Sequence, residues 1–316
     1  MQDETGFAPG TVRVSAEEFV PGVARVEIIF VNVYLVGAPG GPWALVDTGL
    51  PLLSAALIRR AAMKRYGDGA RPEAIVLTHG HFDHAGTALD LARGWEVPIY
   101  AHPLEMPYLT GKSDYPPQDS TMGGAIAQMA RLFPHSGYDF GDRVRPLPAD
   151  GDVPGLPNWT FYHTPGHTPG HVSLFRETDS TLLAGDALTT MNLDSWTSQI
   201  VREREFHRPP APFTPDWEAA RRSIDTLAGL EPSVVAAGHG LPISGPHVAE
   251  ALRSYTGRFI PPDTGRYVGR PARADEEGVR EVPPPVPDPL PMKVAAGATV
   301  AVAAGAVGIA LARRRK

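Results

Sequence analysis

Four side chains that can bind a metal ion lie within six residues of one another, directly after an apolar segment that is typical of a buried strand. In the sequence THGHFDH at 78–84 they are His79, His81, Asp83 and His84. Alternate residues of an extended segment project to one face, so His79 and His81 can bind one ion. Where the chain then turns into a helix, Asp83 and His84 can reach a second ion. The fold must therefore bring this strand end to an edge where other ligands can meet it.

Three further candidate ligands follow predicted strands in the same manner. They are His167 in the sequence TPGHT, Asp186 in AGDA and His239 in AGHG. Glycine or proline beside each lets the backbone turn sharply and present the side chain at the end of a strand. The chain contains no Cys, so any metal ion must be bound by nitrogen and oxygen. Imidazole and carboxylate suit zinc, with Zn–N distances of about 2.0–2.1 Å.

The charge balance and the absence of Cys exclude several classes of function. The 29 Lys and Arg residues are outnumbered by 35 Asp and Glu residues, which gives a net charge of −6. A nucleic-acid-binding protein normally presents a basic face, so no nucleic-acid partner is expected. Without Cys there is no disulfide framework, no Cys-based zinc finger and no thiolate nucleophile. The partner expected at the candidate site is a small-molecule substrate.

Residues 1–260 are predicted to form one catalytic domain in which two sheets pack together with helices outside. The strands fall into two groups, each followed by helices, which favours this arrangement over a single doubly wound parallel sheet. The Pro- and Gly-rich segment 112–141 is expected to be an insertion over the site. Strands are expected at 23–36, 43–46, 73–77, 97–101, 159–163, 172–176, 181–184 and 234–236, and helices at 52–66, 85–93, 122–133, 216–230 and 247–258.

The C-terminal part of the chain has a different composition from the head. Residues 261–293 contain nine prolines and few large apolar residues, which predicts an extended linker. Residues 294–312 carry no charge, and as a helix they would be about 28 Å long, close to the hydrocarbon thickness of a bilayer. The basic residues 313–316 follow. We expect 294–312 to form a single transmembrane anchor, and the alternative is an Ala- and Gly-rich tail in solvent.

The orientation of such an anchor rests on two opposing signals. The N-terminus is acidic where a signal peptide is basic, and no apolar stretch follows it. This places the catalytic domain in the cytoplasm of a protein that spans the membrane once. The four terminal cations favour the reverse, because cations prefer the cytoplasmic side. An apolar stretch with a basic tail also resembles a cell-wall sorting signal, but LPMK at 290–293 does not match LPxTG.

Together the motifs resemble the metallo-β-lactamase-fold hydrolase superfamily, whose hallmark is H-x-H-x-D-H followed by a downstream His, Asp and His. All of them occur in this order between residues 25 and 260. The resemblance implies an α+β fold, a four-layer αββα sandwich with the site along one edge of its two sheets. It also implies two zinc ions per chain, iron or manganese being the alternatives. By this resemblance the first ion is bound by His79, His81 and His167 and the second by Asp83, His84 and His239, with Asp186 bridging them.

Several subgroups of this superfamily have sequence features that this chain lacks, which narrows the set of subgroups that it resembles. The true β-lactamases of this fold use a Cys ligand or lack the bridging Asp, and diiron relatives carry Glu where this chain has His81. Nuclease relatives have additional nucleic-acid-binding parts that this sequence does not show. The sequence HTPGHTPGH at 163–171 is most similar to glyoxalase-II-like thioesterases and lactonase-like members. The basic residues with which glyoxalases bind glutathione are not evident, so the substrate stays open.

The resemblance implies a hydrolytic mechanism. Two divalent cations about 3.5–4 Å apart can share a water and lower its pKa toward about 7. The resulting hydroxide would attack a thioester, lactone or ester carbonyl while a cation stabilises the oxyanion. Asp83, a ligand with a second oxygen free, is the expected catalytic proton shuttle to the leaving group. The alternatives are an iron-dependent redox enzyme of persulfide or oxygen chemistry, and a metal-binding module without catalysis.

Other polar residues near the motifs have simpler interpretations. Asp47 either hydrogen-bonds a ligand histidine or caps the helix that begins near Leu52. His171 is expected to be a buried, hydrogen-bonded histidine near the site, and His163 a strand-end residue. Surface or loop positions are expected for His102, His135, His207 and His247. Local packing is expected for the aromatic residues Tyr108, Tyr115, Trp196 and Phe206, and a solvated charged face for residues 202–205.

Overall fold

The first sheet has seven strands that lie side by side in the order of the sequence. A computed structural model describes residues 16–201 and 204–288 of the chain. Strands β1 to β4 pair antiparallel, and β4 to β7 pair parallel. Helix α1 (Ser54–Tyr66) connects β4 to β5, and α3 (Ala88–Trp95) connects β5 to β6. The strands are β1 (Glu17–Val20), β2 (Val23–Ile28), β3 (Val31–Val36), β4 (Ala44–Val46), β5 (Ala74–Val76), β6 (Ile99–Ala101) and β7 (Val144–Pro146).

The second sheet has five strands in the order β12-β11-β10-β9-β8. Strands β10 and β11 are parallel and are connected by α7 (Trp217–Gly229), whereas the other neighbours are antiparallel. The side chain of Asp216 caps α7 by accepting a hydrogen bond from Ala219 N at 2.9 Å. Helix α8 (Val248–Arg258) follows the sheet. The strands are β8 (Trp159–His163), β9 (Val172–Arg176), β10 (Thr181–Gly185), β11 (Val234–Ala237) and β12 (Ile243–Ser244).

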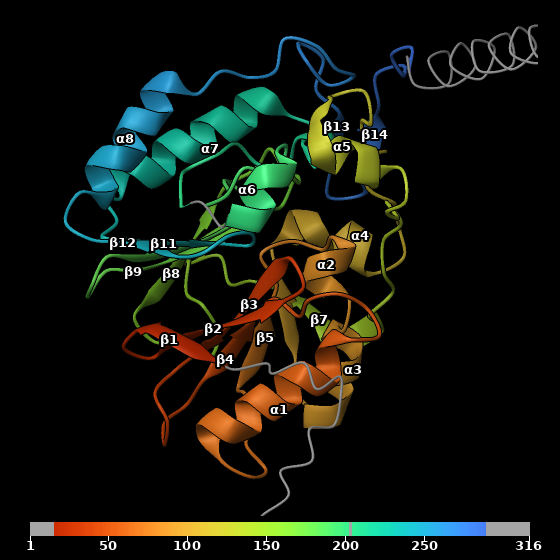
Figure 1. The fold of residues 1–316 in the computed structure, drawn as a ribbon. Helices are drawn as coiled ribbons and strands as arrows, with labels where there is room; N and C mark the ends of the chain where they lie inside the picture. Colours follow the sequence, from red (N-terminus) through yellow and green to blue (C-terminus); the bar gives the residue numbers. More distant parts are fainter. Residues whose placement is uncertain (1–15, 202–203, 289–316) are drawn as a thin grey trace, which may run out of the picture.

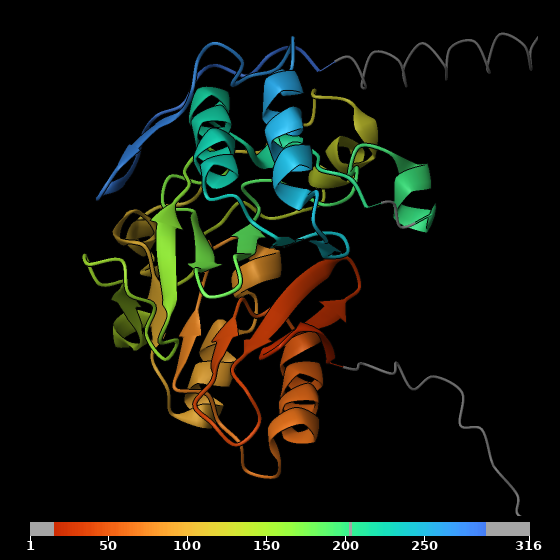
Figure 2. The same ribbon diagram turned by 90° about the vertical axis from the view of Figure 1, so that its left-hand side faces the viewer.

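The helices and the two sheets form four layers, as Figures 1 and 2 show. Three clusters of buried side chains separate these layers. One cluster lies between the first sheet and helices α1 and α3, another between the two sheets, and the third between the second sheet and helices α7 and α8. Successive side chains of a strand point to opposite faces. In β3, Leu35 therefore packs toward the helices, while Tyr34 and Val36 pack between the sheets. The observed layers have the αββα order that the sequence predicts.

Most of the predicted elements are present, with shifts at their ends. The expected helix 85–93 is instead two helices, α2 (Phe82–Ala85) and α3, and the expected helix 122–133 is the shorter α5 (Gly124–Ala130). The strands β1, β7 and β12 were not expected. The remaining short helices are η1 (Pro103–Glu105), α4 (Met106–Leu109), η2 (Gly141–Arg143), α6 (Trp196–Val201) and η3 (Ala211–Phe213).

Residues 261–288, which we call the C-terminal strap, pack against the head. Tyr267 is 2% exposed, and its hydroxyl donates to Pro117 O at 2.5 Å. Strands β13 (Arg273–Asp275) and β14 (Gly278–Glu281) form an antiparallel hairpin. This part of the predicted linker is therefore not an extended spacer.

Several contacts of the strap are made with the segment 112–141, which is far from it in the sequence. The backbone N–H of Val279 donates to Ser113 Oγ at 3.1 Å, and Asp288 forms an ion pair with Arg131. Composition alone predicts an extended segment because it does not reveal partners that the fold supplies from more than a hundred residues away. The boundary at residue 260 stays a prediction.

No helix within residues 16–201 and 204–288 is long and apolar enough to cross a membrane. The predicted transmembrane segment 294–312 lies outside these residues, as does the basic tail 313–316.

Candidate metal centre

Five of the seven predicted ligands lie in loops that follow strands, and the other two, Asp83 and His84, lie in α2. The parallel strands β10 and β11 end at the same edge of the second sheet, and packing of the two sheets brings the residues that follow β5 of the first sheet beside this edge. Potential ligand atoms lie within 4.8 Å of one another in three groups. The groups are His79, His81 and His167; His79, His84 and Asp186; and Asp83, His84 and His239. The structure thus brings the seven side chains together, and their binding of metal ions stays a prediction.

The carboxylate of Asp186 is at the middle of this arrangement. Its Oδ2 lies 3.2 Å from Nε2 of His239, 3.5 Å from Nε2 of His84 and 3.6 Å from Nε2 of His167. Two ligands that bind one ion at about 2.0–2.2 Å are separated by roughly 3–3.5 Å. These distances place the Asp186 carboxylate beside His167, a predicted ligand of the first ion, and beside His84 and His239, predicted ligands of the second ion.

Hydrogen bonds to Asp47 and Thr78 determine which nitrogen of two histidines faces the centre. Asp47 accepts hydrogen bonds at 2.8 Å from Thr78 N, Thr78 Oγ1 and His84 Nδ1. Because Thr78 Oγ1 donates to Asp47, it accepts from Nδ1 of His79, which lies 3.0 Å away. Both histidines thus carry a proton on Nδ1 and direct Nε2 inward. Asp47 does not cap α1, which begins after Leu53 without a side-chain hydrogen bond, so the first of its two interpretations is confirmed.

The first sheet also holds the loop that carries His239. Nδ1 of His239 donates to Phe30 O at 2.7 Å, so Nε2 again faces the other ligands. The side chain of Asn32 donates to Ala237 O at 2.9 Å and to Gly240 O at 2.7 Å. Residue 238 must be glycine here, because a Cβ atom at this position would overlap Oδ1 of Asp186.

Burial and neighbouring charges lower the pKa of three histidines of the centre and raise the pKa of two others. Burial lowers the pKa of His81 to about 3, and it holds the pKa values of His79 and His167 well below their usual range. These imidazoles are neutral, the form in which histidine binds metal. Burial also opposes protonation of His84 and His239, but the negative charge of Asp186 prevails and raises the pKa of both.

Three buried atoms at the centre have no hydrogen-bond partner among the described residues. They are Nε2 of His79, Nε2 of His84 and Oδ1 of Asp186. A buried polar atom without a partner costs roughly 1–3 kcal/mol. A divalent cation that displaces the proton of His84 would satisfy all three, because two imidazole nitrogens and a carboxylate oxygen form a donor set that binds zinc and related metals. The residues present thus fit metal ions at the predicted place.

The structure also settles the position of the other histidines. His171 is buried beside the centre, where Nε2 accepts from Asp186 N at 2.8 Å and Nδ1 bonds Thr164 Oγ1 at 2.8 Å, as the sequence predicts. His163 ends β8 as expected. The remaining histidines that the structure describes are outside the three groups, namely His102, His135, His207 and His247.

Glu105 is a buried residue beside the centre that the sequence did not reveal. It is fully buried, and its carboxylate accepts hydrogen bonds from Gly80 N at 3.0 Å, Thr168 Oγ1 at 2.7 Å and Gly170 N at 2.9 Å, and a further one from the Tyr115 hydroxyl. Burial raises the pKa of Glu105, and these hydrogen bonds act in the opposite direction. The carboxylate therefore ties the loop of His79 and His81 to the loop of His167.

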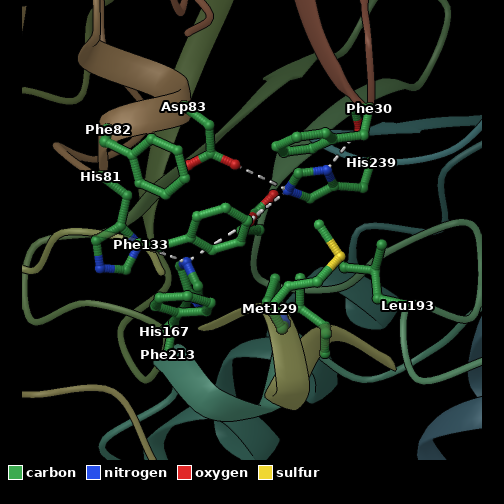
Figure 3. A pocket seen from close by; sticks show the side chains of 13 residues that line it. Phe30, His81, Phe82, Asp83, Met129, Phe133, His167, Leu193, Phe213 and His239 are labelled. Atoms are coloured by element: carbon green, nitrogen blue, oxygen red, sulfur yellow. Dashed lines mark hydrogen bonds and ion pairs between the residues drawn. The ribbon is translucent and has the colours of Figure 1, made fainter. Parts of the chain in front are cut away.

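A pocket opens in front of the centre (Figure 3). Five of the predicted ligands line it, and the segment 112–141 contributes Ile126, Met129 and Phe133, which places this insertion over the site as expected. The ring of Phe30 stacks on the His239 ring, with 6.0 Å between centroids. The pocket is lined by Phe30, His81, Phe82, Asp83, Ile126, Met129, Phe133, His167, Asp186, Leu193, Pro210, Phe213 and His239.

Comparisons with known proteins show which family this sequence is similar to. The model of the metallo-beta-lactamase superfamily matches residues 27–239. The probable metallo-hydrolase YflN of Bacillus subtilis is 43% identical over 245 residues, which cover 77% of this chain and 92% of that protein. The probable metallo-hydrolase YybB of the same organism is 30% identical over 215 residues, covering 68% and 82%.

The similarity extends to solved structures at the level of the fold. A beta-lactamase domain protein from Burkholderia ambifaria is 24% identical, with a TM-score of 0.51, and the match covers 76% of this chain and 74% of that chain. A metallo-beta-lactamase family protein from Thermus thermophilus, TTHA1429, is 23% identical, with a TM-score of 0.50, and the match covers 76% and 80%. At these identities the likeness concerns the fold alone.

Proposed function

This chain belongs to the metallo-beta-lactamase superfamily and is a metallo-hydrolase, and from that premise we propose that it hydrolyses a thioester, lactone or ester with two divalent cations. The observation that carries the proposal is the convergence of three imidazole Nε2 atoms, each fixed by a hydrogen bond at its Nδ1, on the carboxylates of Asp186 and Asp83. Zinc is the metal that we propose, because the donors are imidazole nitrogens and carboxylate oxygens.

Two of the three groups support our assignment of the ligands to two ions, and the third, which contains Asp186, joins a ligand of each ion. The first ion would be held by neutral imidazoles alone and the second by imidazoles and a carboxylate, with Asp186 between them. When bound, divalent cations lower the pKa of a coordinated water toward about 7 and polarise a carbonyl oxygen. The first ion corresponds to His79, His81 and His167, and the second to Asp83, His84 and His239.

Asp83 is the residue that we assign to proton transfer. Its Oδ2 lies 3.6 Å from Nε2 of His239, and the side chain lines the pocket. Burial raises the pKa of Asp83 above its ordinary value. A carboxyl group with a raised pKa that faces the substrate can accept a proton and deliver it to a leaving group. Replacement of Asp83 by Asn should therefore lower kcat for a poor alcohol leaving group more than for 4-nitrophenolate.

The experiment that tests the reaction class is a substrate panel. Protein stripped with a chelator and reloaded with zinc should hydrolyse acyl thioesters, lactones or carboxylic esters, and the stripped protein should not. Phosphodiesters and β-lactams are the matched negative substrates. Turnover of phosphodiesters or β-lactams alone would overturn the proposal, and so would iron in the freshly purified protein together with consumption of oxygen or persulfide.

We also propose that residues 294–312 anchor the protein in a membrane with the catalytic domain in the cytoplasm. The support for the membrane span is the sequence, in which nineteen uncharged residues are long enough as a helix to cross a bilayer. The cytoplasmic side rests on the acidic residues at 3 and 4, and the four terminal cations favour the reverse. The full chain should sediment with membranes, and a chain that ends at residue 293 should stay in the supernatant. Recovery of the full chain in the supernatant would contradict the proposal.

A further inference from the structure

Among the residues that the structure describes, the proposed metal ligands are the only hydrogen-bonding side chains that line the pocket. Five of the thirteen described residues that line it are these ligands, and the other eight are apolar. Figure 3 shows phenylalanine rings and the Met129 side chain around the space in front of Asp83, His81 and His239. A substrate held here meets ligands at one end and only apolar surface elsewhere. The apolar residues are Phe30, Phe82, Ile126, Met129, Phe133, Leu193, Pro210 and Phe213.

The ring of Phe133 lies near three other phenylalanine rings of this wall. Its ring centroid lies 4.9 Å from that of Phe82, 6.3 Å from that of Phe213 and 6.4 Å from that of Phe30. All four rings are only partly buried, as is the side chain of Met129. Partly exposed apolar side chains that gather in one place mark a binding surface. Because the cluster lies against the metal centre, the molecule it binds is the one that reacts there.

The charges around the pocket do not suit an anionic substrate. No described residue of the wall is Lys or Arg. Two arginines on neighbouring segments are paired, Arg131 with Asp288 and Arg208 with Asp194 at 2.7 Å. A carboxylate or phosphate placed against the wall would lose its hydration without gaining a cation or a hydrogen-bond donor.

Resting on the proposed function, we propose that the substrate is an ester, thioester or lactone whose acyl group is uncharged and apolar, and that Met129 and Phe133 select it. Both residues come from the segment 112–141, so this insertion sets the specificity. The carbonyl faces the ligands, and the acyl chain lies among the rings of Phe30, Phe82 and Phe133.

The matched pair of substrates is the 4-nitrophenyl ester of octanoic acid and the mono-4-nitrophenyl ester of octanedioic acid. The two have the same chain length, and only the second ends in a carboxylate. We expect kcat/KM to be at least about tenfold higher for the octanoate. In a series from acetate to octanoate, kcat/KM should rise by up to about fourfold for each methylene that becomes buried.

Two pairs of variants test whether the residues of the pocket wall determine the preference for an uncharged acyl chain. Met129→Lys places a cation in the pocket and should reduce the preference for the octanoate by about tenfold. Gln128→Lys adds the same charge at an exposed position of α5 and should leave the preference unchanged. Phe133→Ala should flatten the dependence on chain length, whereas Leu132→Ala, at a neighbouring residue that is 85% exposed, should preserve it.

A binding measurement on metal-free protein separates this inference from the reaction itself. The methyl resonance of Met129 should shift saturably with 2-decanone, an uncharged ketone, and far less with decanoate. Hydrolysis with an equal or greater kcat/KM for the octanedioate ester would overturn the inference while leaving the proposed function intact. Selective ketone binding without hydrolysis of any ester, thioester or lactone would overturn the proposed function and support the apolar pocket. Equal shifts with ketone and decanoate would overturn the inference.

Discussion

Asp47 orients two neighbouring parts of the metal centre through one buried carboxylate. It accepts from Thr78, which in turn accepts from His79, and it accepts directly from His84. Its backbone has a φ of 59°, in the left-handed region that Asp and Asn tolerate better than most residues. This conformation turns the chain at the end of β4. Asp47 would thus act on bound metal ions through the histidines that it orients, without being a ligand itself.

Removal of the charge of Asp47 should weaken metal binding without removing a ligand. In Asp47→Asn, the amide cannot accept all three hydrogen bonds, so His84 loses its fixed orientation. We expect the affinity for zinc to fall by about 10–100-fold, measured by competition with a chromophoric chelator. Asp90→Asn, at an exposed residue that pairs with Arg59, is the control and should retain wild-type affinity. Equal affinity in the two variants would contradict the role of Asp47.

Glu105 should matter for stability as well as for the ligand loops. In Glu105→Gln, the amide group faces N–H and O–H donors that the carboxylate had satisfied. With one or two buried donors left unpaired, the free energy of unfolding should fall by about 2–4 kcal/mol in a urea titration of metal-free protein. Tyr115→Phe removes only one of the donors and should cost about 1 kcal/mol. A loss in Glu105→Gln no larger than in Tyr115→Phe would argue against Glu105 as the tie between the loops.

The two halves of the centre should respond differently to pH. The pKa values of His84 and His239 are raised by Asp186, so they retain protons near neutral pH that a metal ion must displace. The pKa of His81 is about 3, so His81 has no proton to release there. Raising the pH from 6.5 should therefore strengthen binding of the second ion more than that of the first. Calorimetry in buffers of different ionisation enthalpy measures the protons released, and equal proton release at both sites would contradict this account.

At the scale of elements, the C-terminal strap supports the segment that forms the pocket wall. The Arg131–Asp288 ion pair, the Tyr267 hydroxyl and the Val279 N–H all bind residues between 112 and 131. Helix α5 has only seven residues, a length at which a helix depends on packing for its stability. The strap thus stabilises the element that presents Ile126 and Met129.

Loss of the strap ion pair should loosen α5 and leave the metal centre intact. Asp288→Asn should speed amide hydrogen exchange in residues 124–130 by about two- to fivefold, since a partly exposed pair contributes about 0.5–1 kcal/mol. KM should rise, and the metal content should not change. Asp263→Asn, at an exposed residue of the strap, serves as the control. Unchanged exchange in Asp288→Asn, or a loss of metal, would show that the strap does not act on α5.

Prediction of elements from sequence succeeded where the pattern is local and long enough. Strands β8 and β9 have the predicted bounds, whereas α7 is shorter than predicted by one residue at each end and α8 by one residue at its start. The strands β7 and β12 have three and two residues, so they exist through pairing with a neighbour rather than through a pattern of their own. The same holds for the strap hairpin, whose partners lie far away in the sequence.

For single residues of the site, too, prediction from sequence depends on whether the signal is local. The convergence of the seven predicted ligands could be expected from the sequence, because glycine or another predicted ligand stands beside each of them. Glu105 lies alone in an apolar stretch, and nothing in that stretch shows that the loops of residues 80 and 168 fold over it. Asn32 and Tyr34 are ordinary strand residues until the second sheet places Ala237 O within 2.9 Å and 2.6 Å of them.

At the scale of the whole molecule, the metal centre exists only when both sheets have formed and packed. The ligands are spread from residue 79 to residue 239, and residues of the first sheet position His239 from the second. An ion that binds the folded chain alone stabilises it in proportion to the logarithm of its concentration above the dissociation constant. Metal binding and sheet packing are therefore coupled, and the unpartnered atoms of His79, His84 and Asp186 are where that coupling acts.

The central claim is that one carboxylate, Asp186, joins two metal sites, and the metal content of the chain tests it most directly. Wild-type protein purified without added metal and measured by plasma mass spectrometry should hold about two divalent ions per chain. Asp186→Ala, which lacks the shared carboxylate, should hold at most one and should lose turnover. The same metal content and activity in both proteins would contradict the account.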